Sequence, residues 1–548
     1  MSDDLQRPVL AIEGLSVRLP RGSDRAFAVK DVTLAVMPRE TLCIVGESGS
    51  GKSVIAQSIM GLLPRPLTHA GGSIRLDDES IVDASSRRLR SLRGSRMAMI
   101  FQEPMTALNP MMTIGRQIEE VLQVHTDLSS AEREAQVLSA IADVNLPDAA
   151  LLYHAYPHEL SGGQRQRAMI AAALVLAPAV LIADEPTTAL DVTTQAQILK
   201  LLKDIQRRHG TAIVFITHDI GVVADIADRV AVMRQGELLE EGATRTVLTE
   251  PRHPYTRMLI GSVPGLTPRR VETQAAQEIA ISIDNLGKTY RPTSLFGAKR
   301  TVDALKQVSF DIRRGETFGI VGESGSGKST LARCIVRLVD PSAGEIRLGA
   351  AELAHAAGEQ LRCERRRVQI VFQDPYRSLN PRRTVGQTIV ECPMNYSVPA
   401  AAAWKRAAEL MRLVGLEPAA LSRYPHEFSG GQRQRISIAR ALAVEPELLI
   451  ADEAVSALDV SVQAQVLALL DDIRKCLNLA ILFITHDLRV AAQVCDRVAV
   501  MHRGSIVESG LTETVFSSPQ HPYTRTLLDA APGKGWTFGT HGAVQGPV

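Results

Sequence analysis

The residues with the clearest chemical potential form one loop, Gly46–Ser53, which reads Gly-Glu-Ser-Gly-Ser-Gly-Lys-Ser. It matches the phosphate-binding pattern G-x-x-x-x-G-K-[ST], in which glycines let several backbone N–H groups point to one place. Lys52 would reach the β- and γ-phosphates of a nucleotide, and the Ser53 hydroxyl would bind Mg²⁺. A chance match is the alternative. The recurrence of the same eight residues at Gly322–Ser329 argues against it.

The flanking residues supply the elements that such a loop needs. Thr41–Val45 is a short apolar, β-branched stretch that predicts a buried strand, and Val54–Met60 has helical spacing. Strand, glycine-rich loop and helix in this order are the context in which the motif binds phosphate.

Two acidic residues, Asp184 and Glu185, follow another predicted strand, Val180–Ala183. An aspartate at the end of a buried strand can hold Mg²⁺, and the next residue can orient or deprotonate an attacking water. An ordinary acidic strand end is the alternative, but Asp452 and Glu453 repeat the pair.

A histidine and a glutamine end two further predicted strands. These are His218 and Gln102, with His486 and Gln373 as their repeats. We expect the histidines to contact the γ-phosphate and position the water, and the glutamines to reach Mg²⁺ and the water. A structural histidine and a satisfied polar glutamine are the alternatives.

A second anion-binding helix start is predicted at Ser161–Arg167, which reads Ser-Gly-Gly-Gln-Arg-Gln-Arg and returns at Ser429–Arg435. Ser161 is a good N-cap, and the two glycines allow close approach of the backbone. The alternative is a capped helix with a basic first turn.

All these motifs recur in the same order, so the chain contains an internal duplication. So long a period indicates duplicated domains. We predict domains at 1–261 and 279–531, a linker at 262–278 and a flexible tail at 532–548. In each copy a β-rich stretch precedes apolar strands that alternate with helices, which predicts a mainly parallel sheet covered on both faces. Functional residues then belong at the carboxyl ends of the strands.

Composition narrows the function. The 61 basic and 60 acidic residues of the 548-residue chain nearly cancel, which argues against a strongly electrostatic nucleic-acid binder. The polar start shows no signal peptide, and the longest uncharged run, Ala168–Ala183, contains Pro178 and is too short to span a membrane. The six scattered cysteines form no C-x-x-C pair, so we expect reduced thiols and no metal cluster.

The ordered motifs resemble those of ATP-binding cassette (ABC) ATPases, including the signature loops Leu160–Gln164 and Phe428–Gln432. The resemblance implies an α/β fold of two tandem ABC-type P-loop NTPase domains. Each would have a RecA-like, mainly parallel sheet core, an antiparallel β subdomain and a helical subdomain. In that family two cassettes pair head to tail, and each ATP lies between one phosphate loop and the other cassette's signature.

The motifs and the resemblance together assign the site residues. The expected catalytic residues are Glu185, Glu453, His218 and His486. The expected Mg²⁺ site residues are Ser53, Gln102, Asp184, Ser329, Gln373 and Asp452. The residues expected to bind ATP are Gly46, Glu47, Ser48, Gly49, Ser50, Gly51, Lys52, Ser53, Gly322, Glu323, Ser324, Gly325, Ser326, Gly327, Lys328, Ser329, Thr330, Tyr290, Gln102, Gln373, Ser161, Gly162, Gly163, Gln164, Ser429, Gly430, Gly431 and Gln432.

Phe101–Pro110 and the repeated His-Pro-Tyr-Thr resemble the dipeptide, oligopeptide and nickel importers, and Ala451–Val460 is similar to the glutathione type. The resemblance implies an ATP-hydrolysing subunit at the cytoplasmic face of a bacterial inner membrane. Its partners would be two membrane permease subunits and an extracytoplasmic binding protein. The alternatives are an importer of nickel or another small solute, and a soluble twin-cassette ATPase that acts on the ribosome or DNA.

The first copy departs from the family where an aromatic residue stacks on adenine. Tyr290 fits this role in the second copy, whereas the first has Leu19, with Phe27 nearby but out of register. Because base–aromatic stacking is worth roughly 1–3 kcal/mol in other nucleotide systems, we expect weaker ATP binding in the first copy. The second copy has Ala454 where the first has Pro186, which changes backbone stiffness and removes no catalytic group.

Overall fold

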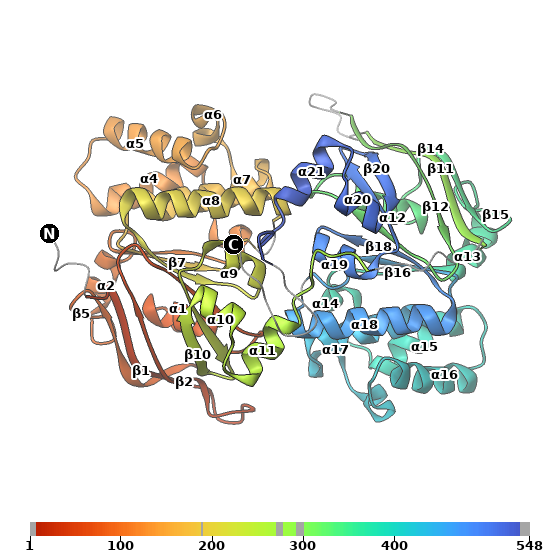
Figure 1. Cartoon of the computed structure of the whole chain (residues 1–548), viewed down its shortest axis with the longest axis horizontal. Coiled ribbons are helices and arrows are strands. Elements are labelled where there is room, and N and C mark those ends of the chain that lie inside the picture. Colours follow the sequence, from red (N-terminus) through yellow and green to blue (C-terminus); the bar gives the residue numbers. More distant parts are fainter. Residues whose placement is uncertain (1–6, 188–189, 270–277, 292–300, 457, 537–548) are drawn as a thin grey trace. The chain divides into compact units, whose positions relative to one another are not determined.

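The computed structural model describes residues 7–187, 190–269, 278–291, 301–456 and 458–536. They divide into two units (Figure 1). Unit 1 runs to Ser262 and includes the segment from Pro532 onward, and unit 2 is Val263–Ala531. Residues 270–277 of the predicted linker and 537–548 of the predicted tail lie outside the described residues.

Unit 1 follows the predicted alternation of strands and helices. Its strands are β1 (Leu10–Arg18), β2 (Phe27–Val36), β3 (Thr41–Val45), β4 (Thr68–Leu76), β5 (Glu79–Ser80), β6 (Met97–Ile100), β7 (Val180–Asp184), β8 (Ala212–Ile216), β9 (Arg229–Arg234) and β10 (Glu237–Ala243). Its helices are α1 (Lys52–Ile59), α2 (Ser86–Leu92), α3 (Pro104–Ala107), α4 (Ile114–His125), α5 (Ser130–Asp143), α6 (Ala149–His154), η1 (Pro157–Glu159), α7 (Gly162–Leu174), α8 (Val192–His209), α9 (Ile220–Ile226), α10 (Thr244–Thr249) and α11 (Pro254–Gly261).

Unit 2 repeats this order. Its strands are β11 (Ile279–Tyr290), β12 (Val302–Arg313), β13 (Thr317–Val321), β14 (Ala343–Leu348), β15 (Ala351–Glu352), β16 (Val368–Val371), β17 (Leu448–Asp452), β18 (Ala480–Thr485), β19 (Arg497–His502) and β20 (Ser505–Leu511). Its helices are α12 (Lys328–Ile335), α13 (Gly358–Arg367), α14 (Pro375–Ser378), α15 (Val385–Asn395), α16 (Ala400–Leu413), η2 (Pro418–Ser422), η3 (Pro425–Glu427), α17 (Gly430–Leu442), α18 (Val460–Leu477), α19 (Leu488–Val494), α20 (Thr512–Ser517) and α21 (Pro522–Asp529).

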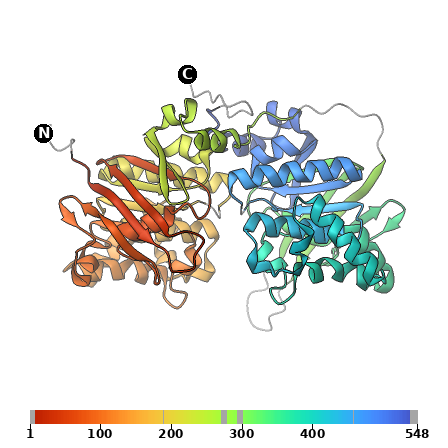
Figure 2. The same ribbon diagram turned by 90° about the horizontal axis from the view of Figure 1, so that it is seen from below.

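Each unit has one mainly parallel sheet and one antiparallel sheet. The six-stranded sheets have the orders β10-β9-β3-β8-β7-β6 and β16-β17-β18-β13-β19-β20. Only the pairs β9–β10 and β19–β20 in them are antiparallel. The four-stranded sheets, β2-β1-β4-β5 and β12-β11-β14-β15, are antiparallel throughout, and that of unit 1 is coloured red to orange in Figure 2. With the helical group α4–α6 or α15–α16 in each unit, the predicted architecture is confirmed.

Alternation along the buried strands gives each central sheet two cores. In unit 2, Ile450 and Leu482 belong to a core shared with the antiparallel sheet, whereas their neighbours Leu449 and Phe483 belong to a core shared with α15–α18. Successive residues of a strand point to opposite faces, so both faces must be apolar when both are covered. This explains the continuous apolar runs in the sequence.

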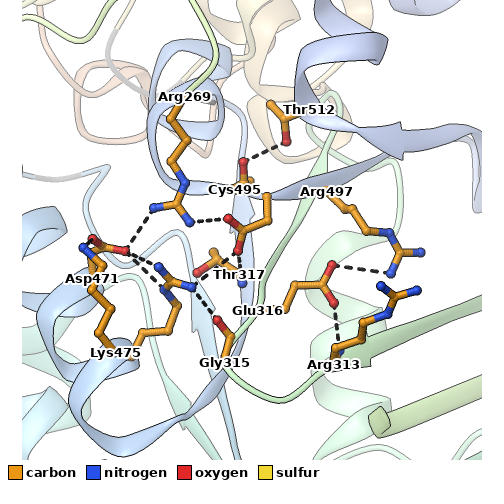
Figure 3. Close-up of polar contacts among 12 residues, drawn as sticks. Arg269, Arg313, Gly315, Glu316, Thr317, Asp471, Lys475, Cys495, Arg497 and Thr512 are labelled. Carbon is orange, nitrogen blue, oxygen red and sulfur yellow. Dashed lines mark hydrogen bonds and ion pairs between the residues drawn. The ribbon is translucent and has the colours of Figure 1, made fainter. Parts of the chain in front are cut away.

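The residues that follow each unit's last helix are held by contacts distant in sequence. Arg269 donates its backbone N–H to the Ala492 carbonyl at 3.0 Å in unit 2, and its guanidinium pairs with Asp471 at 3.0 Å and with Asp496 (Figure 3). In unit 1 the Gly533 N–H donates to the Asp225 carboxylate at 2.8 Å. The sequence predicts a linker and a flexible tail here because nothing local reveals these partners.

We searched the described helices for a membrane span. None of them is both long enough and apolar enough to cross a bilayer.

Candidate nucleotide sites

The phosphate loop of each unit requires glycine for steric reasons. A Cβ on Gly46 would lie 2.2 Å from the Met233 carbonyl oxygen, and one on Gly51 would lie 2.6 Å from the Ala28 carbonyl oxygen. Both residues also have positive φ, 152° and 102°. The backbone therefore turns between β9 and β2 in a path that no other residue type fits. Gly322 and Gly327 meet the same obstacles at 2.2 and 2.5 Å in unit 2.

The lysine of each loop is buried at the start of its helix. Lys52 is 6% exposed, and its Nζ donates to the Gly46 carbonyl at 2.7 Å and the Glu47 carbonyl at 2.9 Å. In unit 2, Lys328 Nζ donates to the same two positions at 2.7 and 2.8 Å. The ammonium groups thus lie inside the loops, where the positive ends of α1 and α12 add to their charge.

A hydroxyl and a carboxylate meet beside each lysine. Ser53 Oγ donates to Asp184 at 3.1 Å, and Ser329 Oγ donates to Asp452 at 3.3 Å. Burial raises the pKa of both aspartates, which a hard cation would reverse by stabilising the charged form. Hydroxyl and carboxylate oxygens are the ligands that Mg²⁺ takes, so this donor set fits the ion.

The predicted catalytic glutamate lies beside the predicted histidine in both units. Glu185 Oε1 is 3.1 Å from His218 Nδ1, and Glu453 Oε1 is 3.4 Å from His486 Nδ1. Both glutamates have positive φ, 47° and 49°, at the turn that leaves the strand. This turn separates each glutamate from the aspartate before it, so the two carboxylates face different partners.

Burial alone would raise the pKa of the Glu453 carboxyl, but the hydrogen bond and positive field from His486 outweigh it and lower the pKa. Conversely, burial would lower the pKa of His486, and the contact with Glu453 raises it above its ordinary value. The pair therefore favours an ionised glutamate beside a protonated histidine.

The two predicted glutamines behave differently. Gln102 Nε2 donates to Glu185 Oε2 at 2.9 Å, so unit 1 joins glutamine, glutamate and histidine in one chain of contacts. Gln373 Nε2 instead donates to Ser456 Oγ at 3.4 Å. The predicted residues thus come together in both units, but the hydrogen bond from glutamine to glutamate is made in unit 1.

The predicted signature helix starts are also in place. Ser161 caps α7 by accepting from the Gln164 N–H at 3.3 Å, and Gln164 returns a bond to the Ser161 N–H at 2.9 Å. Ser429 and Gln432 form the same capping box on α17. Gly163 and Gly431 are needed here because a Cβ would lie 2.8 Å from Thr194 and 2.2 Å from Val462. Their contact with ATP stays a prediction.

The predicted adenine-stacking position differs between the two units in structure as well as in sequence. Tyr290 ends β11 and is 40% exposed, with Lys288 Nζ 5.2 Å from its ring centroid. In unit 1, Phe27 pairs across the sheet with Arg18, whose guanidinium lies 5.5 Å from the ring centroid. Phe27 is therefore out of register with Leu19, as the sequence predicts.

Sequence reasoning missed three contacts of the phosphate loops. The Glu47 N–H donates to the Tyr255 hydroxyl at 3.3 Å, and the Glu323 N–H donates to the Tyr523 hydroxyl at 3.2 Å. The Arg25 guanidinium donates to the Gly49 carbonyl. The repeated His-Pro-Tyr-Thr was a signal for the tyrosines, although it carried no indication of which group they contact.

Comparison with known proteins places these sites in a family. The ABC transporter model matches residues 29–188 and 305–456, and the model of the oligopeptide/dipeptide transporter C-terminal region matches 239–293 and 507–537. The chain is 46% identical over 570 aligned residues to the glutathione import ATP-binding protein GsiA of Escherichia coli K12 and of Shigella boydii serotype 4, covering 97% of this chain and 91% of each relative.

Among solved structures, the chain is similar to the post-hydrolysis dimer of the cassette MJ0796 bound to ADP and Pi, with 29% identity and a TM-score of 0.39 over 42% of this chain and 98% of that one. Over 44% of this chain and 92% of that one, CbiO1 from Clostridium perfringens is 28% identical with a TM-score of 0.39. The family matches decide the identity: this chain belongs to the ABC transporter ATP-binding proteins of the oligopeptide/dipeptide type, which bind and hydrolyse ATP to drive import.

Proposed function

We propose that this chain energises uptake of a short peptide of the glutathione type. It would act at the cytoplasmic face of a bacterial inner membrane, on two separate permease subunits that an extracytoplasmic binding protein supplies. The 46% identity to glutathione import ATP-binding proteins over 97% of the chain carries this proposal. The repeated C-terminal region of the oligopeptide/dipeptide type supports the peptide class over nickel.

In each unit the proposed site supplies three functions. The phosphate loop and its lysine bind the nucleotide phosphates, and Ser53 with Asp184, or Ser329 with Asp452, would hold Mg²⁺, which supplies charge neutralisation on the phosphates. Glu185 and Glu453 accept a proton from the attacking water and orient it. His486 holds the Glu453 carboxylate in the ionised form, and His218 contacts Glu185 through the same pair of atoms. Most of the catalysis then rests on positioning and electrostatic stabilisation.

Exposed apolar residues follow both glutamines and suit a permease contact. Met105 and Tyr376 occupy the same position after Gln102 and Gln373, and they are 56% and 67% exposed. In unit 2 a hollow of about 250 Å³ lies alongside, lined by Val336, Leu338, Arg365, Val368, Gln369, Ile370, Phe372, Cys392 and Arg440. A short amphipathic segment of a membrane subunit fits an apolar hollow with basic edges.

The test is reconstitution of the chain with the permease subunits that co-purify with it. We expect the binding protein loaded with glutathione to stimulate ATP hydrolysis and uptake of labelled glutathione into vesicles. The variant E185Q/E453Q should block both. A co-purifying binding protein that takes nickel, a sugar or an inorganic anion would overturn the peptide assignment and leave the ATPase assignment standing.

A further inference from the structure

Both phosphate loops are attached to the C-terminal helix of their unit by one tyrosine. Tyr255 is the second residue of α11 and is 3% exposed, and Tyr523 is the second residue of α21. Their hydroxyl oxygens accept the N–H of Glu47 and Glu323, which lie 208 and 200 residues away in sequence. The same long-range contact thus forms independently in both copies.

The contact restrains one particular peptide group. The Gly46–Glu47 peptide offers its carbonyl to Lys52 Nζ at 2.7 Å and its N–H to Tyr255 at 3.3 Å. Because a trans peptide is planar, with its C=O and N–H on opposite sides, fixing the N–H also fixes the direction of the carbonyl. Gly46 has no side chain of its own, so the direction of this peptide depends on the hydrogen bonds that its C=O and the Glu47 N–H make. The tyrosine therefore fixes the direction of one of the two carbonyl groups that accept from the lysine ammonium, the other being the Glu47 carbonyl.

Unit 2 contains the same arrangement. The Gly322–Glu323 peptide lies between Lys328 Nζ at 2.7 Å and the Tyr523 hydroxyl at 3.2 Å. The rings themselves are held from the other side by different residues. The Arg234 guanidinium lies 4.7 Å from the Tyr255 ring centroid, and the His502 ring stacks at 4.0 Å on Tyr523.

The tyrosine is held rigidly by the strand before its helix. In unit 1, His253 Nδ1 accepts the Tyr255 N–H at 3.1 Å and caps α11, and the Glu240 carboxylate on β10 accepts the His253 N–H at 3.0 Å. In unit 2, His521 and Glu508 repeat these bonds at 3.2 and 3.0 Å. Because these bonds already fix the tyrosine backbone, its hydroxyl can restrain the phosphate loop at little further cost in conformational entropy.

We propose that Tyr255 and Tyr523 are positioning residues of the two ATP sites, which hold the phosphate-loop lysine where the nucleotide phosphates bind. The C-terminal helices α11 and α21 thereby become part of the nucleotide-binding machinery. The inference deepens the proposed ATP-site assignment and depends on it.

The test uses the full chain and the variants Y255F and Y523F, which remove one hydroxyl and keep the ring. Photolabelling with 8-azido-ATP, followed by cleavage and mass spectrometry, gives the half-saturating concentration for each unit separately. We expect Y255F to raise this concentration about fivefold in unit 1 only and Y523F to do so in unit 2 only, the loss that follows from one hydrogen bond worth ~1 kcal/mol. The melting temperature should fall by no more than a few degrees, which is the cost of one lost hydrogen bond.

The matched control is Y153F, which removes the hydroxyl of a half-buried tyrosine that is bonded to Glu119 at 3.0 Å in the helical group of unit 1. It should leave labelling of both units unchanged. The proposal is overturned if Y255F and Y523F label like the wild type, or if they only lower the melting temperature. If the wild-type chain takes label in neither unit, the ATP-site assignment fails as well, which separates the two failures.

Discussion

The residues beside the phosphate loop, here called its rim, differ between the two units. The Ala28 and Ala304 carbonyls pack against Gly51 and Gly327, so these two alanines are equivalent positions. Three residues earlier, unit 1 has Arg25 and unit 2 has Thr301. At the end of the preceding strand, unit 2 has the larger functional side chain. Tyr290 lies there, and Leu19 is its equivalent in unit 1.

The two sites therefore differ in the interaction that they offer a nucleotide, which is a positive charge in unit 1 and an aromatic ring in unit 2. Arg25 Nη2 donates to Gly49 in the phosphate loop, its Nε is buried without a hydrogen-bond partner, and among the described residues no carboxylate pairs with it. Unit 1 thus has a cation just before β2, whereas unit 2 has an exposed aromatic ring at the end of β11. A guanidinium attracts phosphate and also stacks on bases, so Arg25 would offset part of the binding that unit 1 loses with the aromatic residue. The weaker ATP binding expected in unit 1 stays a prediction.

The largest expected effect comes from removing the proposed catalytic carboxylate of both units at once. We expect E185Q/E453Q to bind ATP normally and to lose at least about 100-fold in kcat, the range typical of a general base. Steady-state phosphate release measures this. Each single variant should lower the rate as well. A single variant with an unchanged rate would show that the glutamate of that unit is not catalytic.

A smaller effect should distinguish the two rims. We expect R25A to weaken nucleotide binding in unit 1 about tenfold, and Y290A to do the same in unit 2, because a charge-assisted bond and a base stack are each worth roughly 1–3 kcal/mol. Site-resolved photolabelling measures both. Binding in unit 1 should weaken more with added salt than binding in unit 2, since Arg25 adds an ionic contact to the lysine that both loops have.

The matched control at this rim is T301A, which shortens the exposed residue at the position of Arg25. It should leave both units unchanged. Equal salt dependence in the two units, or an R25A variant that binds as the wild type does, would contradict the assignment of Arg25.

The units also differ in the residues on the matching helices α8 and α18. In unit 2, α18 contacts Arg269 of the segment 263–269. Unit 2 has Asp471 and Arg474, whereas unit 1 has Lys203 and Gln206 at the same helix positions. Burial alone would raise the pKa of Asp471, but hydrogen bonds from Lys475, Arg474 and Arg269 lower it strongly. The pairing with Arg269 is therefore specific to unit 2.

We expect D471N to open the segment 263–269 about fivefold more often, the change that corresponds to ~1 kcal/mol for a partly exposed ion-pair network. The rate of tryptic cleavage after Arg269 measures this, with D472N on the same helix as the control. Because the folded state lowers the pKa of Asp471, its contribution is present above the ordinary value of 3.8 and is lost only as the pH falls through the lower, folded-state value. A difference between the variants that already disappears at pH 6 would contradict this contact.

The sequence predicts the parts of these sites that depend on neighbours in the chain. The strand Thr41–Val45, the loop after it and the capping box at Ser161 are all local, and the structure contains each of them. The parallel topology then brings Gln102 and His218 to Glu185, because strand ends meet at one edge of a sheet.

What the sequence does not predict are contacts between elements far apart in the chain. The bond from Glu47 to Tyr255 spans 208 residues, and that from Arg269 to Asp471 spans 202. No periodicity or spacing relates such residues, since the docking of α11 and of segment 263–269 depends on the packed fold. The reach of Arg25 to Gly49 depends likewise on the path of the β1–β2 hairpin.

The smallest expected effect tests the turn after each catalytic glutamate, where Pro186 in unit 1 stands opposite Ala454 in unit 2. The preceding glutamates have nearly equal φ, 47° and 49°, so the chain enters the turn in the same way in both units. A proline at a compatible position stabilises by reducing the freedom of the unfolded chain, by about 0.4–1 kcal/mol. We expect A454P to raise the stability of unit 2 by this amount and P186A to lower that of unit 1.

Differential scanning calorimetry of the two variants measures these changes as shifts of a few degrees or less, in opposite directions. Because neither substitution changes a catalytic group, kcat should stay within about twofold of the wild type, far from the effect of a lost general base. A large fall in the kcat of A454P with unchanged stability would instead mean that the freedom of the turn after Glu453 is itself needed for hydrolysis. The two units would then differ in mechanism as well as in the residues that hold the nucleotide.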